Sequence, residues 1–231
     1  MNPKVRTHFK DPTRLLRLPL FTALLGLAGC VLPDPDDLVL GTQFRPTNVH
    51  VEKRRLTPAL RRVVVLPLTS ELSGSAANNA QEEVETALRS AMKGTQRFEV
   101  VWLTPTEVRE STGRSDWSVL EELPADFFIK LQGRSGCDAV LFARLTRYEP
   151  YPPLAVGWHL KLVGSPTPQV LWELDEVFDA REPGVANAAR RFQQSNRTVG
   201  AGPADSRVVL SSPRRFVAYA ANATFLTLPA Q

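Results

Sequence analysis

Apolar runs and amphipathic stretches alternate along most of this sequence. Residues 62–69 form a nearly continuous apolar run that suits a central strand covered on both faces, and Pro67 predicts its end. In residues 80–92 the apolar positions recur at helical spacing, and Gly94 follows as a stop signal. Residues 98–103 form another apolar run. These patterns predict a strand, a helix and a second strand in succession.

The next part of the sequence carries clear helix boundaries. Thr104 and Glu107 have the spacing of a capping box, with a proline at the first helical position. A further helix is expected from Pro124 to near Gly136, followed by a strand over residues 139–148. The alternation of strands and helices therefore continues.

Two strands with regular alternation are predicted over residues 154–163 and 170–178, joined by a Gly-Ser-Pro-Thr-Pro turn. One face of this hairpin is apolar and is expected to be buried beneath a helix; it comprises Trp158, Leu160, Leu162, Val170, Trp172 and Leu174. The opposite face is polar and places His159 and Lys161 against Glu173 and Asp175 as cross-strand neighbours.

Two more helices are expected near the end of the sequence. The first carries apolar residues at helical spacing over 185–192, and a polar stretch at 193–205 predicts a loop after it. Ser212 and Pro213 mark the start of the last helix. This order of elements predicts an α/β domain with a mixed sheet.

The first 30 residues have the pattern of an export signal. Five basic residues precede a short apolar run over residues 18–29. A run of about a dozen residues is too short to span a bilayer, which needs roughly 20 residues. Residues 27–30 read Leu-Ala-Gly-Cys, and this sequence resembles the bacterial lipobox. The small residues before the cysteine leave room for processing enzymes, and only a thiol can form the thioether.

The lipobox resemblance implies that a diacylglycerol is attached to the Cys30 thiol. It also implies that a peptidase cuts between Gly29 and Cys30 after export through the Sec pathway. The lipid then holds the mature protein on a membrane. Val31 follows the cysteine in place of aspartate, which favours the periplasmic face of the outer membrane by resemblance to proteobacterial sorting rules. The long basic leader, residues 1–17, leaves open a later start codon.

Residues 30–60 are expected to form a flexible tether that begins at the lipidated cysteine. Prolines interrupt this segment and aspartates keep its first part hydrated. Two apolar patches, residues 38–40 and 49–51, leave open that part of it joins the sheet. The chain therefore divides into a signal peptide at 1–29, the tether, and a single domain at 61–231.

The charge balance changes once the signal is removed. The whole chain has 28 basic and 24 acidic residues, and residues 1–29 hold five basic residues and one acidic residue. The mature chain is left with 23 of each, so the basic surface that nucleic-acid binding requires is missing. One dense basic cluster stays: Lys53, Arg54, Arg55, Arg61 and Arg62. It is either a solvated face or a contact for anionic lipid headgroups or glycan.

No motif in the sequence predicts catalysis, a metal or a cofactor. Cys137 is expected to be a small buried residue, and with Cys30 lipidated it has no disulfide partner. His50 and His159 lack the spacing of metal ligands. Residues 133–136 lack the frame of a nucleophile elbow.

Two acidic groups are the other candidate sites. Glu82, Glu83 and Glu85 fall on a predicted helix, where a solvated face is expected rather than an acid–base pair. Asp175, Glu176 and Asp179 offer carboxylates for Ca²⁺ but lack the loop sequence of a calcium site.

The strand sequences resemble those of a periplasmic family. The matching segments are residues 63–68, 98–101, 136–141 and 170–173. They are similar to the family of the TolB amino-terminal domain, the curli-secretion lipoprotein, the Pel-export lipoprotein and the lipoprotein activators of penicillin-binding proteins. The resemblance covers roughly residues 60–195. It implies a three-layer αβα sandwich, with a mixed sheet of about five strands and helices on both faces, and no shared catalytic residues.

Three functions are open at this point. The first is an outer-membrane lipoprotein that binds an unidentified envelope protein, as an accessory or assembly factor of an envelope machine. The second is a homo-oligomeric, non-pore ring subunit of a polysaccharide or protein export system, because no pair of long amphipathic membrane hairpins is evident. The third, an enzyme, is disfavoured by the missing catalytic motifs.

Overall fold

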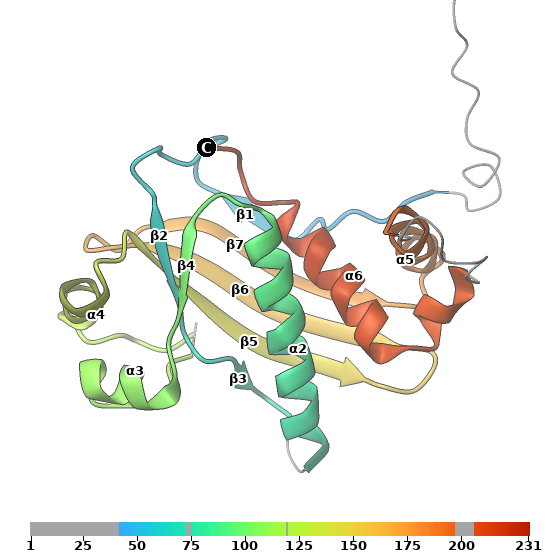
Figure 1. Cartoon of the computed structure of the whole chain (residues 1–231), viewed down its shortest axis with the longest axis horizontal. Coiled ribbons are helices and arrows are strands. Elements are labelled where there is room, and N and C mark those ends of the chain that lie inside the picture. Colours follow the sequence, from blue (N-terminus) through green and yellow to red (C-terminus); the bar gives the residue numbers. More distant parts are fainter. Residues whose placement is uncertain (1–41, 73–74, 119, 197–205) are drawn as a thin grey trace, which may run out of the picture. The chain divides into compact units, whose positions relative to one another are not determined.

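A mixed sheet forms the centre of the molecule (Figure 1). The computed structural model describes residues 42–72, 75–118, 120–196 and 206–231. The sheet has seven strands in the order β1-β7-β6-β5-β2-β4, and β3 pairs with β5. The strands are β1 (Val49–Val51), β2 (Arg62–Val65), β3 (Thr69–Ser70), β4 (Glu99–Trp102), β5 (Ala139–Glu149), β6 (Ala155–Gly164) and β7 (Val170–Asp179).

The sheet has a parallel and an antiparallel half. Strand β2 pairs in parallel with β4 and β5, as expected for strands joined through helices. The β5–β6–β7 part is antiparallel, and β1 adds to β7 in antiparallel orientation. The predicted mixed α/β sheet is therefore confirmed, and the strands added to the predicted set are the short β1 and β3.

Helices cover both faces of the sheet. They are α2 (Ser75–Gly94), α3 (Pro105–Thr112), α4 (Phe127–Ser135), α5 (Pro183–Ser195) and α6 (Pro213–Phe225), with a 3₁₀ turn η1 at Ser206–Leu210. Val63 and Val65 of β2 face the core beneath α2, α5 and α6, whereas Val64 between them faces the core beneath α3 and α4. This alternation along one buried strand confirms the αβα sandwich.

Local sequence signals set most helix ends. At the start of α3, Thr104 accepts from the Glu107 backbone N–H and Glu107 accepts from the Thr104 backbone N–H, which completes the predicted capping box. Gly136 ends α4 in the left-handed conformation at φ 64°. Helix α4 begins at Phe127, later than the predicted Pro124, because residues 124–126 form a turn first.

The apolar face of the β6–β7 hairpin lies in the core as predicted, with one exception. Leu160 pairs with Leu174 and Leu162 with Trp172, and all four side chains are buried under the helices. The placement of Val170 on this face is wrong. The register shifts after Leu162, so that Val163 pairs with Val170 and both line a hollow on the opposite face. One extra residue in a β-bulge reverses the direction of the side chains beyond it.

The second half of the predicted tether belongs to the folded domain. Strand β1 extends the sheet, and the Phe44 ring lies 5.6 Å from that of Phe178. Leu56 and Leu60 are buried in the core. The expectation of a flexible tether up to residue 60 therefore does not hold for residues 44–60. Residues 30–41 lie outside the described residues.

A single carboxylate ties the start of β2 to the start of β5. The Asp138 Oδ2 atom accepts hydrogen bonds from the backbone N–H groups of Arg61 and Arg62, at 2.8 and 2.9 Å. The Asp138 backbone N–H in turn donates to the Arg62 carbonyl oxygen. The side chain therefore fixes the position at which the two parallel strands begin.

Replacing Asp138 with alanine is expected to lower the free energy of unfolding by about 1–3 kcal/mol, because two hydrogen bonds to a charged acceptor are lost at a partly exposed site. Urea unfolding measures the change. Asp138→Asn keeps one acceptor oxygen and is the matched control, with a smaller loss expected. An alanine variant as stable as the wild type would show that these bonds do not stabilise the strand pair.

Candidate functional site

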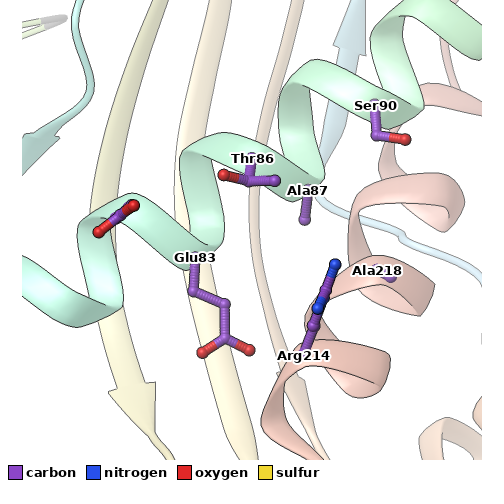
Figure 2. Close-up of a pocket in the computed structure, with 7 residues that line it drawn as sticks. Glu83, Thr86, Ala87, Ser90, Arg214 and Ala218 are labelled. Atoms are coloured by element: carbon purple, nitrogen blue, oxygen red, sulfur yellow. The ribbon is translucent and has the colours of Figure 1, made fainter.

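A hollow lies between α2 and α6, on the face of the sheet that α2, α5 and α6 cover (Figure 2). It has a volume of about 660 Å³. Its walls are Glu82, Glu83, Thr86, Ala87 and Ser90 from α2 and Arg214 and Ala218 from α6. Small side chains on the facing sides of the helices leave this space open. Figure 2 shows Glu83 and Arg214 projecting into it from opposite walls.

Glu83 differs from its two acidic neighbours on α2. Its Oε2 atom accepts a 2.7 Å hydrogen bond from the Tyr148 hydroxyl of β5. Burial, and next this bond to the carboxylate, raises the pKa of Tyr148 above its ordinary value, so the phenol stays a donor well above neutral pH. Glu82 is exposed as predicted, and Glu85 forms an ion pair with Arg89. The prediction of a solvated face is therefore wrong for Glu83.

The hollow continues along α6. A second hollow of about 430 Å³ shares Ala87, Ser90 and Ala218 with the first and reaches Leu226. A third, of about 620 Å³, shares Phe192 and Leu226 with the second and extends to residues 43–46. We call this series the α6 groove. Leu226 is 73% exposed and adds apolar surface just after the end of α6.

The walls of the α6 groove are chemically mixed. Its walls combine small and apolar side chains with a few hydroxyl, amide and arginine groups. None of the described side chains that line it is a cysteine or a histidine. The groove is long, open and partly apolar.

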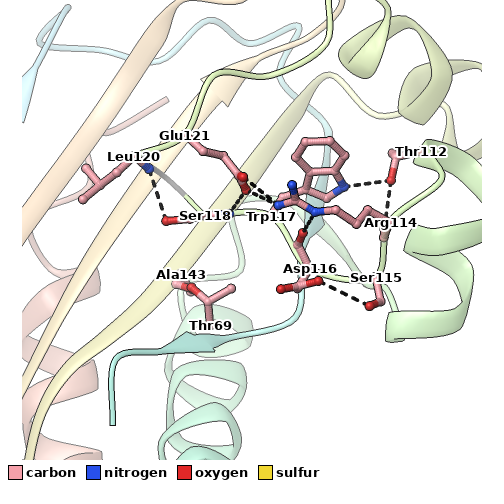
Figure 3. Close-up of polar contacts among 10 residues, drawn as sticks. All are labelled: Thr69, Thr112, Arg114, Ser115, Asp116, Trp117, Ser118, Leu120, Glu121 and Ala143. Carbon is pink, nitrogen blue, oxygen red and sulfur yellow. Dashed lines mark hydrogen bonds and ion pairs between the residues drawn. The ribbon is translucent and has the colours of Figure 1, made fainter.

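A network of polar contacts holds the loop that follows α3 in place (Figure 3). The Arg114 guanidinium lies 4.1 Å from the centre of the Trp117 ring and donates to both oxygens of Glu121 at 2.6 Å. The Trp117 ring N–H donates to Thr112 Oγ1 at 2.8 Å. Burial opposes ionisation of Glu121, but the bonds from Arg114 and the Ser118 backbone N–H outweigh it and lower the pKa of Glu121. These groups satisfy one another, so the loop is a structural element.

The polar face of the β6–β7 hairpin forms a third cluster. His159 is 8% exposed, and its Nε2 atom lies 2.6 Å from Glu173 Oε1. Lys161 reaches the same oxygen at 3.4 Å. His50 on β1 pairs with Glu173 across the strands and is exposed, as is Asp175. The predicted polar face is therefore present, with Glu173 at its centre.

Two of the three carboxylates considered as calcium ligands make structural contacts, and the third, Asp175, is exposed. The Glu176 Oε2 atom accepts from the backbone N–H groups of Thr47 and Asn48. Asp179 pairs with Arg147 and Arg181. Across the described ranges, no group of three histidine, cysteine, aspartate or glutamate residues has a metal-binding arrangement.

The other residues that the sequence analysis considered as functional sites lie in separate parts of the chain. Cys137 is fully buried, as predicted, with its sulfur 3.9 Å from the Ser165 hydroxyl. Residues 133–136 form the end of α4. The charge of Arg62 does not add to the basic cluster predicted from the sequence, because its guanidinium pairs with Glu99. The predicted lipidation and cleavage residues, Gly29 and Cys30, lie outside the described residues.

No sequence-family profile matches this chain, and no curated protein is significantly similar to it. Solved structures do resemble it. The PelC dodecamer of Paraburkholderia phytofirmans is 11% identical, with a TM-score of 0.40, over 79% of this chain and 96% of that one. Lipoprotein GNA1162 of Neisseria meningitidis is 18% identical, with a TM-score of 0.40, over 59% and 99% of the two chains.

The LpoB C-terminal domain of Salmonella enterica is a third structural neighbour, 17% identical with a TM-score of 0.35, over 51% of this chain and 82% of that one. The Pel-export group of the predicted resemblance is thus among the structural neighbours. Within the described part of the chain, no helix is both long and apolar enough to cross a membrane.

Proposed function

We propose that this chain is a lipoprotein of the outer membrane, anchored on its periplasmic face through Cys30. In this proposal it acts by binding an envelope protein, as an accessory or assembly factor of an envelope machine, and has no enzymatic activity of its own. The observation that carries the proposal is the Leu-Ala-Gly-Cys sequence at residues 27–30, behind a basic leader and a short apolar run.

The α6 groove is the proposed binding surface. It is open along α2, α5 and α6, and its walls offer apolar contacts together with polar groups that can fix a partner's orientation. The other hollow with an apolar floor, beside Phe128 and Phe142, is smaller, at about 350 Å³.

Photo-crosslinking in intact cells tests this surface. A photoreactive phenylalanine analogue at Ser90, which lines the groove, is expected to give a discrete adduct with a second envelope protein. The matched control site is Ile129, which is 61% exposed on α4, on the opposite side of the sheet. An adduct at Ser90 that disappears when Ala218→Arg fills the groove supports the proposal.

Two other outcomes contradict the proposal. Adducts that are multiples of this chain alone would favour the ring-forming alternative. Equal adducts from Ser90 and Ile129, or none from Ser90 in the membrane-bound protein, would show that the groove is not the binding surface.

A further inference from the structure

The connection between β1 and β2 concentrates positive charge. We call residues 52–61 the basic loop; it contains four basic residues and one acidic residue, Glu52. The basic residues are Lys53, Arg54, Arg55 and Arg61, and all four are exposed. The mature chain has equal numbers of basic and acidic residues, so this is a local excess and not a general property of the protein.

The basic loop is firmly attached to the domain. Leu56 and Leu60 insert into the core, with 5% and 2% of their surfaces exposed. The Leu56 backbone N–H donates to the Ala230 carbonyl oxygen at 2.8 Å, and the Gln231 side chain donates to the Leu60 carbonyl oxygen at 2.7 Å. The loop backbone is therefore already ordered in the folded domain. Binding through its four cations needs little further loss of backbone entropy.

The cations of the basic loop have no partners among the described residues. The side chains of Lys53, Arg54, Arg55 and Arg61 make no ion pair or hydrogen bond with the described residues. Several basic side chains on other elements are instead matched to carboxylates, in the pairs Arg114–Glu121, Lys130–Asp126, Arg134–Glu110, Arg144–Glu71, Arg147–Glu149 and Arg181–Glu149. The loop charges are thus available to an external anion.

The basic loop also lies close in the chain to the proposed anchor. Cys30 is 12 positions before Thr42, where the described chain begins, and this stretch can span at most about 40 Å. Figure 1 shows the segment from there running past β1 to the loop, beside the C-terminus. A lipid-anchored chain can therefore bring the loop to the membrane, where exposed cations within about 8 Å of anionic headgroups are attracted to them.

We infer that the basic loop docks the domain on the anionic phospholipid surface of the membrane that carries its lipid anchor. This inference rests on the proposed function for the identity of the membrane. Docking adds an electrostatic contact to the acyl anchor and limits the orientations of the domain. None of the residues that line the α6 groove belongs to the basic loop, so docking leaves the groove accessible to a protein partner.

Vesicle flotation of the unacylated mature chain tests the inference. The chain starts at residue 30 and carries Cys30→Ser, so that any binding is independent of lipidation. We expect it to float with phosphatidylethanolamine vesicles that contain phosphatidylglycerol and not with vesicles that lack it. Salt should weaken the binding. Lys53→Glu with Arg54→Glu should lower the partition coefficient at least about tenfold, and Lys53→Gln with Arg54→Gln should lower it less.

Arg109→Glu with Arg215→Glu is the matched control, because it makes the same charge change at two exposed arginines, on α3 and α6, that do not line the α6 groove. Its binding should fall less than about twofold. The inference is overturned if both double variants bind equally weakly, or if binding does not depend on phosphatidylglycerol. It is also overturned if the folded chain binds an anionic polysaccharide and not the vesicles. Acylation of Cys30 is measured separately, so either proposal can fail without the other.

Discussion

Replacing Trp172 with alanine is expected to lower the free energy of unfolding by about 3–5 kcal/mol, the range for a large aromatic side chain removed from a core. Trp172 has no exposed surface and lies on β7 beneath α6. Its ring stacks on Phe225 with 6.2 Å between centroids, and its ring N–H donates to Thr227 Oγ1 at 3.0 Å. The substitution therefore opens a cavity where the sheet meets the last helix.

Chemical denaturation of the wild type and of two variants measures this effect. Thr227→Val removes the acceptor and keeps the packing, so it should cost about 1 kcal/mol. A loss below about 1 kcal/mol for Trp172→Ala would mean that the predicted apolar face of the hairpin does not form the core.

Replacing Cys30 with serine is expected to abolish lipidation and the processing that depends on it. Serine has no thiol to form the thioether, and the lipoprotein peptidase requires the acylated residue. The variant should accumulate as the uncut precursor, or be cut elsewhere and released. A single acyl chain binds membranes only marginally, and two or three chains bind stably, so the wild type should resist salt extraction.

Metabolic labelling with a clickable palmitate analogue, combined with membrane fractionation, measures both consequences. The folded domain should be unchanged, because Cys30 precedes its first described residue by 12 positions. Equal labelling of the wild type and of Cys30→Ser would show that the lipid is not carried by this cysteine.

Regular periodicity made much of the fold predictable. The alternation in residues 154–163 identifies a strand and assigns Trp158, Leu160 and Leu162 to one buried face. The capping box at Thr104 gives the start of α3 for the same reason, since both signals are local in the sequence. Val170 was assigned to the wrong face because a bulge depends on how two strands meet, which periodicity in one strand does not encode.

The N-terminal boundary of the domain depends on long-range contacts. Leu56 and Leu60 stand among prolines and arginines, a composition that is typical of a linker. They are buried because the C-terminal residues Ala230 and Gln231 hydrogen-bond to this segment. An isolated apolar residue in a polar stretch gives no periodic signal, so the sequence pattern alone does not reveal this contact.

The candidate site is harder to predict from the sequence than the domain boundary. Two of the helices that form the α6 groove, α2 and α6, lie more than 100 residues apart, and the Glu83–Tyr148 bond joins residues 65 positions apart. No local motif marks either one. The basic loop is the exception, since its charge excess is visible in the sequence, although its attachment to the core is not.

Mass spectrometry of the N-terminal peptide of the protein purified from membranes tests the lipoprotein proposal most directly. The account predicts a peptide that begins at Cys30 and carries the mass of a diacylglycerol on its sulfur. A peptide that contains an intact Gly29–Cys30 bond, or one with a free Cys30 thiol, would contradict it.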